Sequence, residues 1–456
     1  MLLLLIVLLA FFLRWGVWMK NLTDFALKGD ALNYHIMAHQ IVEDGVYGYA
    51  LGRKSGEPNA YVTPGYPLFL SAVYAVVEDP YRQISVVRGI QVLVGSLTCV
   101  LAYLVVHRLL RRNNVALLTA FFVAIYPPYV QSAIQLLTEV LALATLLLYG
   151  WLAVMAFETR KAAHHFAAGV ALALHVLVRP VLLPVAILPF LFALRSEAWR
   201  GRWREWATAG AWTAFGFVLL MLPWWVRNAV VLDQVILTAT GSANPFLAGT
   251  YPYLKNMLAD FYALGLTSED QGWFARQRLI KGFTTEPLLY LKWYTIGKIQ
   301  FLFEKPWLYQ QIDDWFPALS PWNHRLHAAI CGFGAAGLLY GAVVSRRLRA
   351  VAACGALFLA LYLLFVPTTR YAYPFMAFLM LGTAFLLCEG MRALRSARRP
   401  HRFVDRMALE QARWDSPQPP RRGMFGGDDG APDAPPVRRF PPFALATGGT
   451  ISYPYN

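Results

Sequence analysis

The sequence predicts an all-α integral membrane protein, and composition is the first observation behind this prediction. Of the 456 residues, 57% are apolar and only 15% are charged, whereas soluble domains average about 25% charged residues. Such a composition excludes an ordinary cytosolic enzyme and a disordered chain. The four cysteines all lie within apolar runs, so neither a disulfide framework nor a CxxC metal site is expected.

Long apolar runs are the second observation. A helix that crosses a bilayer needs roughly 20 mostly apolar residues, and the chain offers about ten such segments separated by polar or basic residues. We therefore predict about ten transmembrane helices. They lie near residues 2–19, 84–107, 115–134, 136–157, 164–178, 181–194, 206–226, 326–344, 351–366 and 372–391.

The distribution of basic residues is the third observation. The formal charge is +15, and arginine and lysine gather in the loops after every second predicted span and in the segment after residue 391. The positive-inside rule places these loops in the cytoplasm, together with both termini. The excess charge thus indicates topology in the inner (plasma) membrane and contact with membrane lipids, and no nucleic-acid partner. The first span carries Arg14, lacks a basic flank and is expected to be an uncleaved anchor.

Two polar regions then fall on the outer face, at residues 20–83 and 227–325. Both are too long to be simple turns, and they contain amphipathic helical patterns, for example at 288–303. A membrane domain is therefore expected over residues 1–394. The remaining segment, 395–456, is rich in proline, glycine and arginine, and a disordered cytoplasmic tail is predicted there.

Four ionisable residues lie near the outer ends of predicted spans, where charges are costly and often functional. They are Glu139, Arg179, Arg227 and Arg370. Taken singly, each has a plain interpretation as an interfacial residue, a membrane anchor or a helix cap. Three arginines that converge on one face are better explained as a phosphate site, because guanidinium groups bind phosphate with paired hydrogen bonds.

The first outer loop contains a candidate base. Asp30 opens a helical pattern that has Tyr34 on the same face, so its carboxylate is either an N-cap or a general base in a cleft near the membrane. His35 and His39 are four residues apart, with Glu43 four further on, a spacing compatible with a divalent metal. Without a further ligand the match is weak, and no metal site is assigned.

At this point the sequence resembles a known family. GDALNYHIMAHQI (29–41) and VTPGYPLFLSAVY (62–74) are similar to the first outer loop of bacterial membrane glycosyltransferases related to the protein O-mannosyltransferases and the lipid A aminoarabinose transferase. QLLTEVLA, LVRP, LPWWVRN and TTRYAYP follow in the order expected of that group, so that the resemblance covers about residues 1–391. It implies the C-type glycosyltransferase (GT-C) fold.

The resemblance also implies an activity: transfer of a sugar from a polyprenyl-phosphate carrier to a hydroxyl of a glycan, lipid or protein, on the outer face. It makes Asp30 the catalytic base, although Ala31 stands where several members have a second carboxylate. Attack opposite the leaving group would invert the anomeric centre. The candidates for binding substrate or phosphate are Arg179, Arg227, Arg370, Arg53, Lys54, Glu139 and Tyr34. Some distant members use a divalent metal, which nothing in this sequence requires.

Two other function classes stay open. A transporter or lipid flippase would also have many spans, intramembrane charges and broken helices, but it does not explain a large outer loop with Asp30 before an amphipathic helix. The sequence has no GxxxxGK[ST] motif and no internal repeat. The third class is a membrane scaffold subunit, in which replacing Asp30 or Arg370 would impair assembly instead of product formation.

Overall fold

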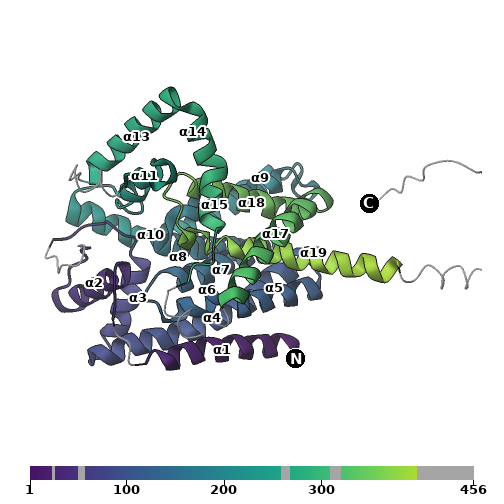
Figure 1. Cartoon of the computed structure of the whole chain (residues 1–456), viewed down its shortest axis with the longest axis horizontal. Helices are drawn as coiled ribbons and strands as arrows, with labels where there is room; N and C mark the ends of the chain where they lie inside the picture. The colour runs from purple at the N-terminus through teal and green to yellow at the C-terminus, as the bar shows by residue number, and fades with distance from the viewer. Residues whose placement is uncertain (23–25, 50–56, 258–267, 309–319, 398–456) are drawn as a thin grey trace, which may run out of the picture. The chain divides into compact units, whose positions relative to one another are not determined.

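A computed structural model describes residues 1–22, 26–49, 57–257, 268–308 and 320–397, and within these ranges the chain forms helices and connecting segments with no β-strand (Figure 1). The predicted all-α class is therefore confirmed. The predicted tail at 395–456 falls almost entirely outside the described residues, as do Arg53 and Lys54.

The centre of the protein is a series of long helices in which each packs against the next. In order of contact they are α1 (Leu2–Lys20), α4 (Pro80–Leu110), α7 (Glu139–Thr159), α8 (Ala162–Val178) and α10 (Trp203–Leu232). Helices α8 and α10 approach closely because Gly169 lies against the backbone of Thr213, and Gly216 against that of Phe166. Small residues of this kind permit close helix packing inside a membrane.

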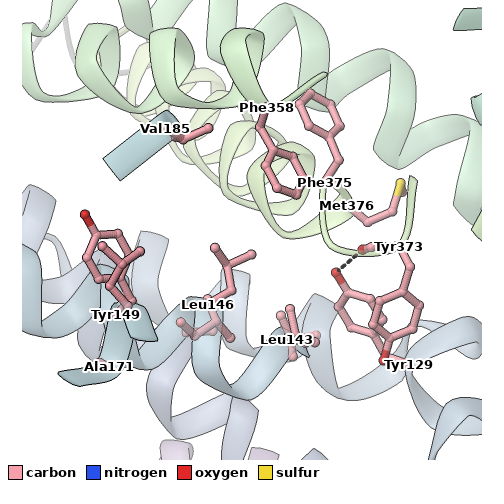
Figure 2. Close-up of a cluster of buried hydrophobic side chains, with 14 of the residues drawn as sticks. Tyr129, Leu143, Leu146, Tyr149, Ala171, Val185, Phe358, Tyr373, Phe375 and Met376 are labelled. Atoms are coloured by element: carbon pink, nitrogen blue, oxygen red, sulfur yellow. Dashed lines mark hydrogen bonds between the residues drawn. The ribbon is translucent and has the colours of Figure 1, made fainter. Parts of the chain in front are cut away.

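A second group of helices completes the core. It consists of α5 (Asn113–Ile125), α17 (Ser320–Val344), α18 (Arg346–Tyr362) and α19 (Met376–Ala397). Helices α17 and α19 cross where Gly337 lies directly on Gly382. Figure 2 shows the buried side chains where this group meets α7, including the hydrogen bond of 2.9 Å that the Tyr129 hydroxyl donates to the Tyr373 carbonyl.

The two outer polar regions form shorter helices. The first contains α2 (Asp30–Asp44) and α3 (Gly65–Tyr74). The second contains α11 (Ala243–Gly249), η4 (Pro252–Leu254), α13 (Ser268–Thr285), α14 (Pro287–Lys292), the π-helical turn η5 (Trp293–Gly297) and α15 (Lys298–Phe303). Lys298 donates hydrogen bonds to the carbonyls of Leu363 (2.6 Å) and Phe365 (3.1 Å), which fixes the segment before Arg370.

The protein is confirmed as a multi-pass membrane protein, but the number of spans is not. Six described helices are long and apolar enough to cross a membrane, or seven if the bent helices over 113–134 form one span. Helices α8 and α18 have 17 residues each, slightly fewer than the roughly 20 that a perpendicular span needs. The count of about ten therefore stays a prediction.

The predicted span at 181–194 is broken, as the three prolines in and just before it lead us to expect. This segment forms the 3-10 helix η2 (Pro180–Ile187) and then the short helix α9 (Leu188–Leu194). Pro180, Pro184 and Pro189 each lack an amide hydrogen, so the regular α-helical hydrogen bonds cannot form. The apolar composition indicates a span, and the positions of the prolines determine that its first part is a 3-10 helix.

The predicted span at 115–134 is broken rather than straight. Helix α5 bends by 61° into α6 (Pro127–Gln131) and the 3-10 turn η1 (Ser132–Ile134). The bend brings the chain back toward the first residue of α7, which is Glu139. A cluster of polar groups gathers there.

The predicted division into two faces agrees with the arrangement of charged side chains. Glu158, at the end of α7, forms ion pairs with Arg108 (2.9 Å) and Arg111 (3.0 Å) from one loop assigned to the cytoplasm and with Arg347 (4.0 Å) from another. Glu139 begins the same helix, so the two carboxylates lie about 30 Å apart at 1.5 Å per residue. The basic loops and the polar cluster therefore occupy opposite ends of α7.

Candidate active site

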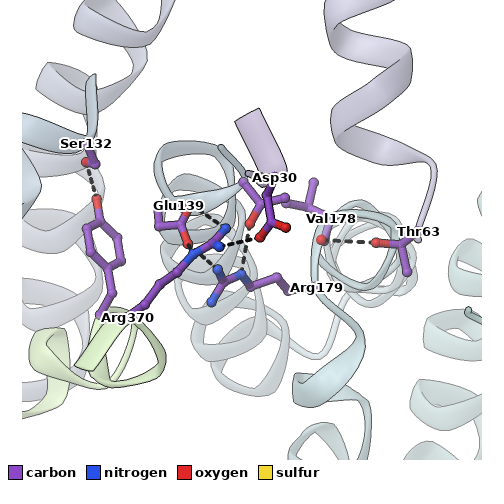
Figure 3. A network of polar contacts seen from close by, with 9 residues as sticks. Asp30, Thr63, Ser132, Glu139, Val178, Arg179 and Arg370 are labelled. Atoms are coloured by element: carbon purple, nitrogen blue, oxygen red, sulfur yellow. Dashed lines mark hydrogen bonds and ion pairs between the residues drawn. The ribbon is translucent and has the colours of Figure 1, made fainter. Parts of the chain in front are cut away.

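Glu139 is the centre of the candidate site (Figure 3). Its side chain is only 1% exposed and contacts two arginines. Arg370 donates from Nε to Oε1 at 2.5 Å and from Nη2 to Oε2 at 3.4 Å, while Arg179 donates from Nη2 to Oε1. The interpretation of Glu139 as a carboxylate exposed to headgroup water is therefore wrong.

Arg370 connects this buried centre to Asp30. It lies on η7 (Thr369–Ala372), between α18 and α19, and its Nη1 donates to Oδ2 of Asp30 at 2.6 Å. Burial acts to lower the pKa of Arg370, but the carboxylates of Glu139 and Asp30 raise it well above the usual value. Arg370 therefore stays charged, and the ring of Trp307 lies 5.9 Å from its guanidinium carbon.

The carboxylate of Asp30 is the accessible part of the site. It is 47% exposed, compared with 21% for Arg370. The alternative in which Asp30 caps α2 is wrong, because Gly29 occupies the N-cap position and Asp30 is the first helical residue. Its described hydrogen bonds come from Arg370 and from the Tyr49 hydroxyl at 3.4 Å. The carboxylate is thus available for chemistry instead of being used by its own helix.

Two side chains of α4 hold the segment that presents Glu139. Arg88 donates to the Ile134 carbonyl at 2.9 Å, and Gln91 donates to the carbonyls of Ala133 (3.0 Å) and Gln135 (2.8 Å). These carbonyls belong to η1 and the turn after it, where regular helical hydrogen bonds are missing. Satisfying buried carbonyls removes a penalty of about 1–3 kcal/mol each and fixes where α7 begins.

Arg179 is positioned by the proline that follows it. A residue before proline is disfavoured in the α region, and Arg179 is extended, with φ −147° and ψ 114°. The guanidinium therefore turns away from α8 toward Glu139, and its Nε also donates to the Thr138 hydroxyl at 3.0 Å. The outer loop docks beside it: Thr63 donates to the Val178 carbonyl at 3.1 Å (Figure 3).

Tyr34 lies near Arg370 and Asp30 and does not hydrogen-bond to a charged group within the described residues. Its ring packs edge-to-face on Tyr66 at 5.2 Å and on Tyr49 at 6.2 Å. Burial raises the pKa of Tyr34, so its hydroxyl is neutral. Its predicted contact with substrate stays a prediction. The contacts that the structure shows are packing contacts with other tyrosines of the first outer loop.

Arg227 is the sequence candidate that does not join the cluster. It donates to the backbone carbonyls of Asn59 (3.0 Å) and Tyr47 (2.9 Å), and to the side chain of Asn228 (3.0 Å). The rings of Tyr47 and Trp224 flank it at 5.1 and 5.4 Å. A guanidinium held in this way fastens the outer loop to α10, and its predicted phosphate contact stays a prediction.

The histidine pair is engaged with neighbouring side chains. His35 pairs through Nδ1 with the Tyr74 hydroxyl at 2.7 Å, and His39 pairs through Nδ1 with Glu43 at 3.2 Å. Burial lowers the pKa of His35 to about 4, with a contribution from His39. Among the residues that the structure describes, no group of three or more His, Cys, Asp or Glu side chains has a geometry suited to a metal ion.

Sequence reasoning did not identify Thr138, Tyr49 or Trp307 as parts of this site. Thr138 directly precedes Glu139 and lies within the quoted QLLTEVLA motif, so its position was a usable signal. Tyr49 and Trp307 are separated from Asp30 and Arg370 by many residues. An aromatic residue in a polar loop is not part of any sequence motif that would indicate a functional role. Only the fold brings these rings to the site.

Comparison with known proteins agrees with this architecture. Residues 69–233 match the sequence model of the dolichyl-phosphate-mannose-protein mannosyltransferase family. This segment, about a third of the chain, includes Glu139, Arg179 and Arg227, whereas Asp30 and Arg370 lie outside it. A comparison of the whole chain with curated proteins finds no match.

Solved structures of the oligosaccharyltransferase of Archaeoglobus fulgidus are similar in fold. The complex with zinc and sulfate has a TM-score of 0.54 and 17% identity, over 90% of this chain and 51% of that enzyme. The complex with an inhibitory peptide and a dolichol-phosphate gives 0.51 and 16%, over 90% and 52%. The form tethered to an acceptor peptide with an NVT sequon gives 0.53 and 16%, over 87% and 50%.

This chain spans about half the length of those enzymes. At such identities the likeness shows the fold, which is that of a C-type membrane glycosyltransferase. Together with the family match, it confirms the resemblance to the protein O-mannosyltransferase group that the sequence motifs indicated.

Proposed function

We propose that this protein transfers a sugar from a polyprenyl-phosphate carrier to an acceptor hydroxyl at the outer face of the membrane, with Asp30 as the general base. One observation supports the proposal above all. A half-exposed carboxylate lies against a buried cluster of two arginines and one further carboxylate, at the end of α7 opposite the basic loops.

The proposed reaction balances as follows. Asp30 takes the proton of the acceptor hydroxyl while that oxygen forms a bond to C1 of the sugar. The bond from C1 to the phosphate oxygen breaks, and the carrier leaves with the electron pair. Attack from the side opposite the phosphate inverts the anomeric centre. Nothing in this sequence of steps requires a proton for the leaving group, because a lipid phosphate is a weak base.

Charge explains the need for the arginines. The donor phosphodiester carries one negative charge, whereas the released phosphomonoester tends toward two, so negative charge moves from Asp30 to phosphate during the reaction. Positive groups placed where charge develops stabilise the transition state. Arg370 bonds Asp30 before the reaction, and this bond weakens once Asp30 is protonated, which leaves Arg370 available to the phosphate.

Arg179 is the other phosphate candidate. Its Nε and Nη2 bind Thr138 and Glu139, whereas no hydrogen bond is described for its Nη1 among the residues with defined positions. The Glu139 carboxylate thus fixes the orientation of both guanidinium groups and neutralises one of the two positive charges. Together with an ionised Asp30, the cluster has no net charge before an anionic donor binds.

The experiment uses purified full-length protein in proteoliposomes with radiolabelled polyprenyl-phosphate mannose or glucose and a panel of peptide, glycan and lipid acceptors. Release of polyprenyl phosphate and labelled product is measured for wild type and Asp30→Asn. We expect turnover in the wild type and a loss of at least about 100-fold in the variant, since general-base catalysis contributes 10²–10⁴-fold.

A correctly folded Asp30→Asn protein that retains wild-type turnover would refute Asp30 as the base. Movement of the lipid donor across the bilayer without any transfer of its sugar would instead identify a flippase.

A further inference from the structure

Tyr49, in the first outer loop, donates a hydrogen bond to the candidate base. The hydroxyl of Tyr49 lies 3.4 Å from Oδ1 of Asp30 and also accepts a hydrogen bond of 2.9 Å from Nδ2 of Asn33. A hydroxyl has one hydrogen to donate, and Asn33 supplies a donor, not an acceptor. The Tyr49 hydrogen is therefore directed at Asp30, one helical turn before Asn33.

The ring of Tyr49 is held on both sides. It stacks on Tyr61 with centroids 5.1 Å apart and an interplanar angle of 15°, and it meets Tyr34 edge-on at 6.2 Å. Burial and the nearby Asp30 raise the pKa of Tyr49. The hydroxyl therefore remains protonated at neutral pH and remains a donor.

The backbone of Tyr49 is fixed by the side chain of Asn59. The amide of Tyr49 donates to Oδ1 of Asn59 at 3.1 Å, and Nδ2 of Asn59 donates to the Tyr49 carbonyl at 3.0 Å. Arg227 in turn holds both segments of this loop, because it donates to the carbonyls of Asn59 (3.0 Å) and Tyr47 (2.9 Å). A continuous series of contacts thus leads from α10 to Asp30.

We propose that Tyr49 is a positioning residue for Asp30, and that Arg227 and Asn59 hold it in place. The proposal rests on the function proposed above and explains how the base keeps its orientation. Arg370 holds Oδ2, and Tyr49 holds Oδ1, so the plane of the carboxylate is fixed at two points. Tyr49 thus helps to keep the carboxylate directed toward the acceptor until the proton is transferred and Arg370 becomes available to the phosphate.

The central variant is Tyr49→Phe, which removes one oxygen and keeps the ring. Without the hydrogen bond that Tyr49 donates, Oδ1 of Asp30 is no longer held and the carboxylate can rotate away from the acceptor. We expect kcat to fall about 10-fold, because the base spends less time in the productive orientation. The KM for the lipid donor should stay within about twofold, because Tyr49 contacts neither Arg179 nor Arg370.

Tyr61→Phe is the matched control. It removes a hydroxyl from the stacked partner, for which no hydrogen bond is described in the defined part of the chain, and it should leave kcat unchanged. A Tyr49→Phe protein with wild-type kcat would overturn the proposal. An equal loss of kcat in the two variants would also overturn it, since it would indicate only a general effect of the loop.

Arg227→Gln separates the two roles open to this arginine. If Arg227 holds the loop, the variant lowers kcat and leaves the donor KM nearly unchanged, and Arg227→Lys restores little, because one ammonium cannot replace a planar group that spans two carbonyls. A selective increase of the donor KM would instead show that Arg227 binds phosphate.

Asp30→Asn is measured in parallel in every series. If that variant keeps its turnover, the proposed function of Asp30 fails. If it is inactive while Tyr49→Phe matches wild type, only the positioning role of Tyr49 fails.

Discussion

Glu139 shows how one residue decides the properties of the site. It is 1% exposed and shared between Arg179 and Arg370. Transferring a charged group into a poorly polarisable interior costs several kcal/mol unless partners compensate. Two guanidinium groups therefore depend on one carboxylate, with Asp30 as a second partner for Arg370 only. Within the described residues, removing the Glu139 charge should leave Arg179 without its carboxylate partner and Arg370 with Asp30 alone.

We predict that Glu139→Gln lowers the free energy of unfolding by about 3 kcal/mol and reduces turnover by at least about 100-fold, in the range of effects attributed to preorganised charge. Thermal unfolding in detergent and the transfer assay measure these effects. The double variant Glu139→Gln/Arg179→Gln restores the charge balance and should recover part of the stability while remaining inactive. Wild-type stability in the single variant would contradict the shared role.

The burial of His35 predicts that the stability of the protein depends on pH. Its pKa is about 4 in the folded protein, because of burial and then His39, against 6.5 for the ordinary group. Between these values the unfolded chain binds more protons than the folded one, so stability falls as the pH decreases from 6.5 to 4.

We expect acidification from pH 7 to pH 5 to remove about 1 kcal/mol at this partly exposed site. The change in melting temperature over this pH range should be smaller in His35→Gln than in wild type. His39→Gln serves as the control, since burial of His35 persists in it. An equal change in wild type and His35→Gln would show that another group is responsible.

At the scale of elements, Arg14 compensates for the break between α5 and α6. Prolines 127 and 128 lack the amide hydrogens that the carbonyls of Val123 and Ala124, four residues earlier, would normally accept. Arg14 donates to both of these carbonyls, at 3.1 Å each. A charge within the first predicted span, which composition could not explain, therefore satisfies a helix broken more than 100 residues later.

We predict that Arg14→Met destabilises the protein by about 2 kcal/mol, since two buried carbonyls lose their donor at about 1–3 kcal/mol each and the cost of burying a charge is relieved. Adding Pro127→Ala and Pro128→Ala should restore stability by supplying the missing amides. The same triple variant should lose activity, because a straighter helix displaces Glu139. Melting temperatures and turnover of the single and triple variants test this, and an Arg14→Met protein as stable as wild type would contradict it.

At the scale of the whole molecule, the helices place two kinds of polar chemistry at opposite ends of α7. One end has Glu158 among basic loops, and the other has Glu139, Arg179, Arg370 and Asp30. The positive-inside rule assigns the basic end to the cytoplasm. A lipid-linked donor and an acceptor outside the cytoplasm would then meet at the site.

This topology predicts which positions a membrane-impermeant maleimide can reach in intact cells. Val235, 86% exposed after α10, should be labelled as Val235→Cys, whereas Trp203→Cys, at a position that is 67% exposed before α10, should be labelled only after permeabilisation. The native cysteines are buried or half-buried and give the background signal. Labelling of position 203 in intact cells would reverse the proposed orientation.

The sequence by itself determined the membrane class, the division into two faces and the candidates Asp30, Glu139, Arg179 and Arg370. These features rest on hydrophobicity, charge distribution and short motifs, which are local properties of the chain. The order of the motifs also indicated the family resemblance, because this order is a property of the linear sequence.

Only the tertiary structure decided which of these residues meet. Arg370 contacts Asp30 across 340 positions of the chain, and Arg227, equally conspicuous in sequence, holds a loop backbone instead. It also showed that Asp30 is not a helix cap and that Tyr49 contacts it. The physical reason is that a charge in a low-dielectric interior must find its partner through space, and the packing of distant helices determines which partner is within reach.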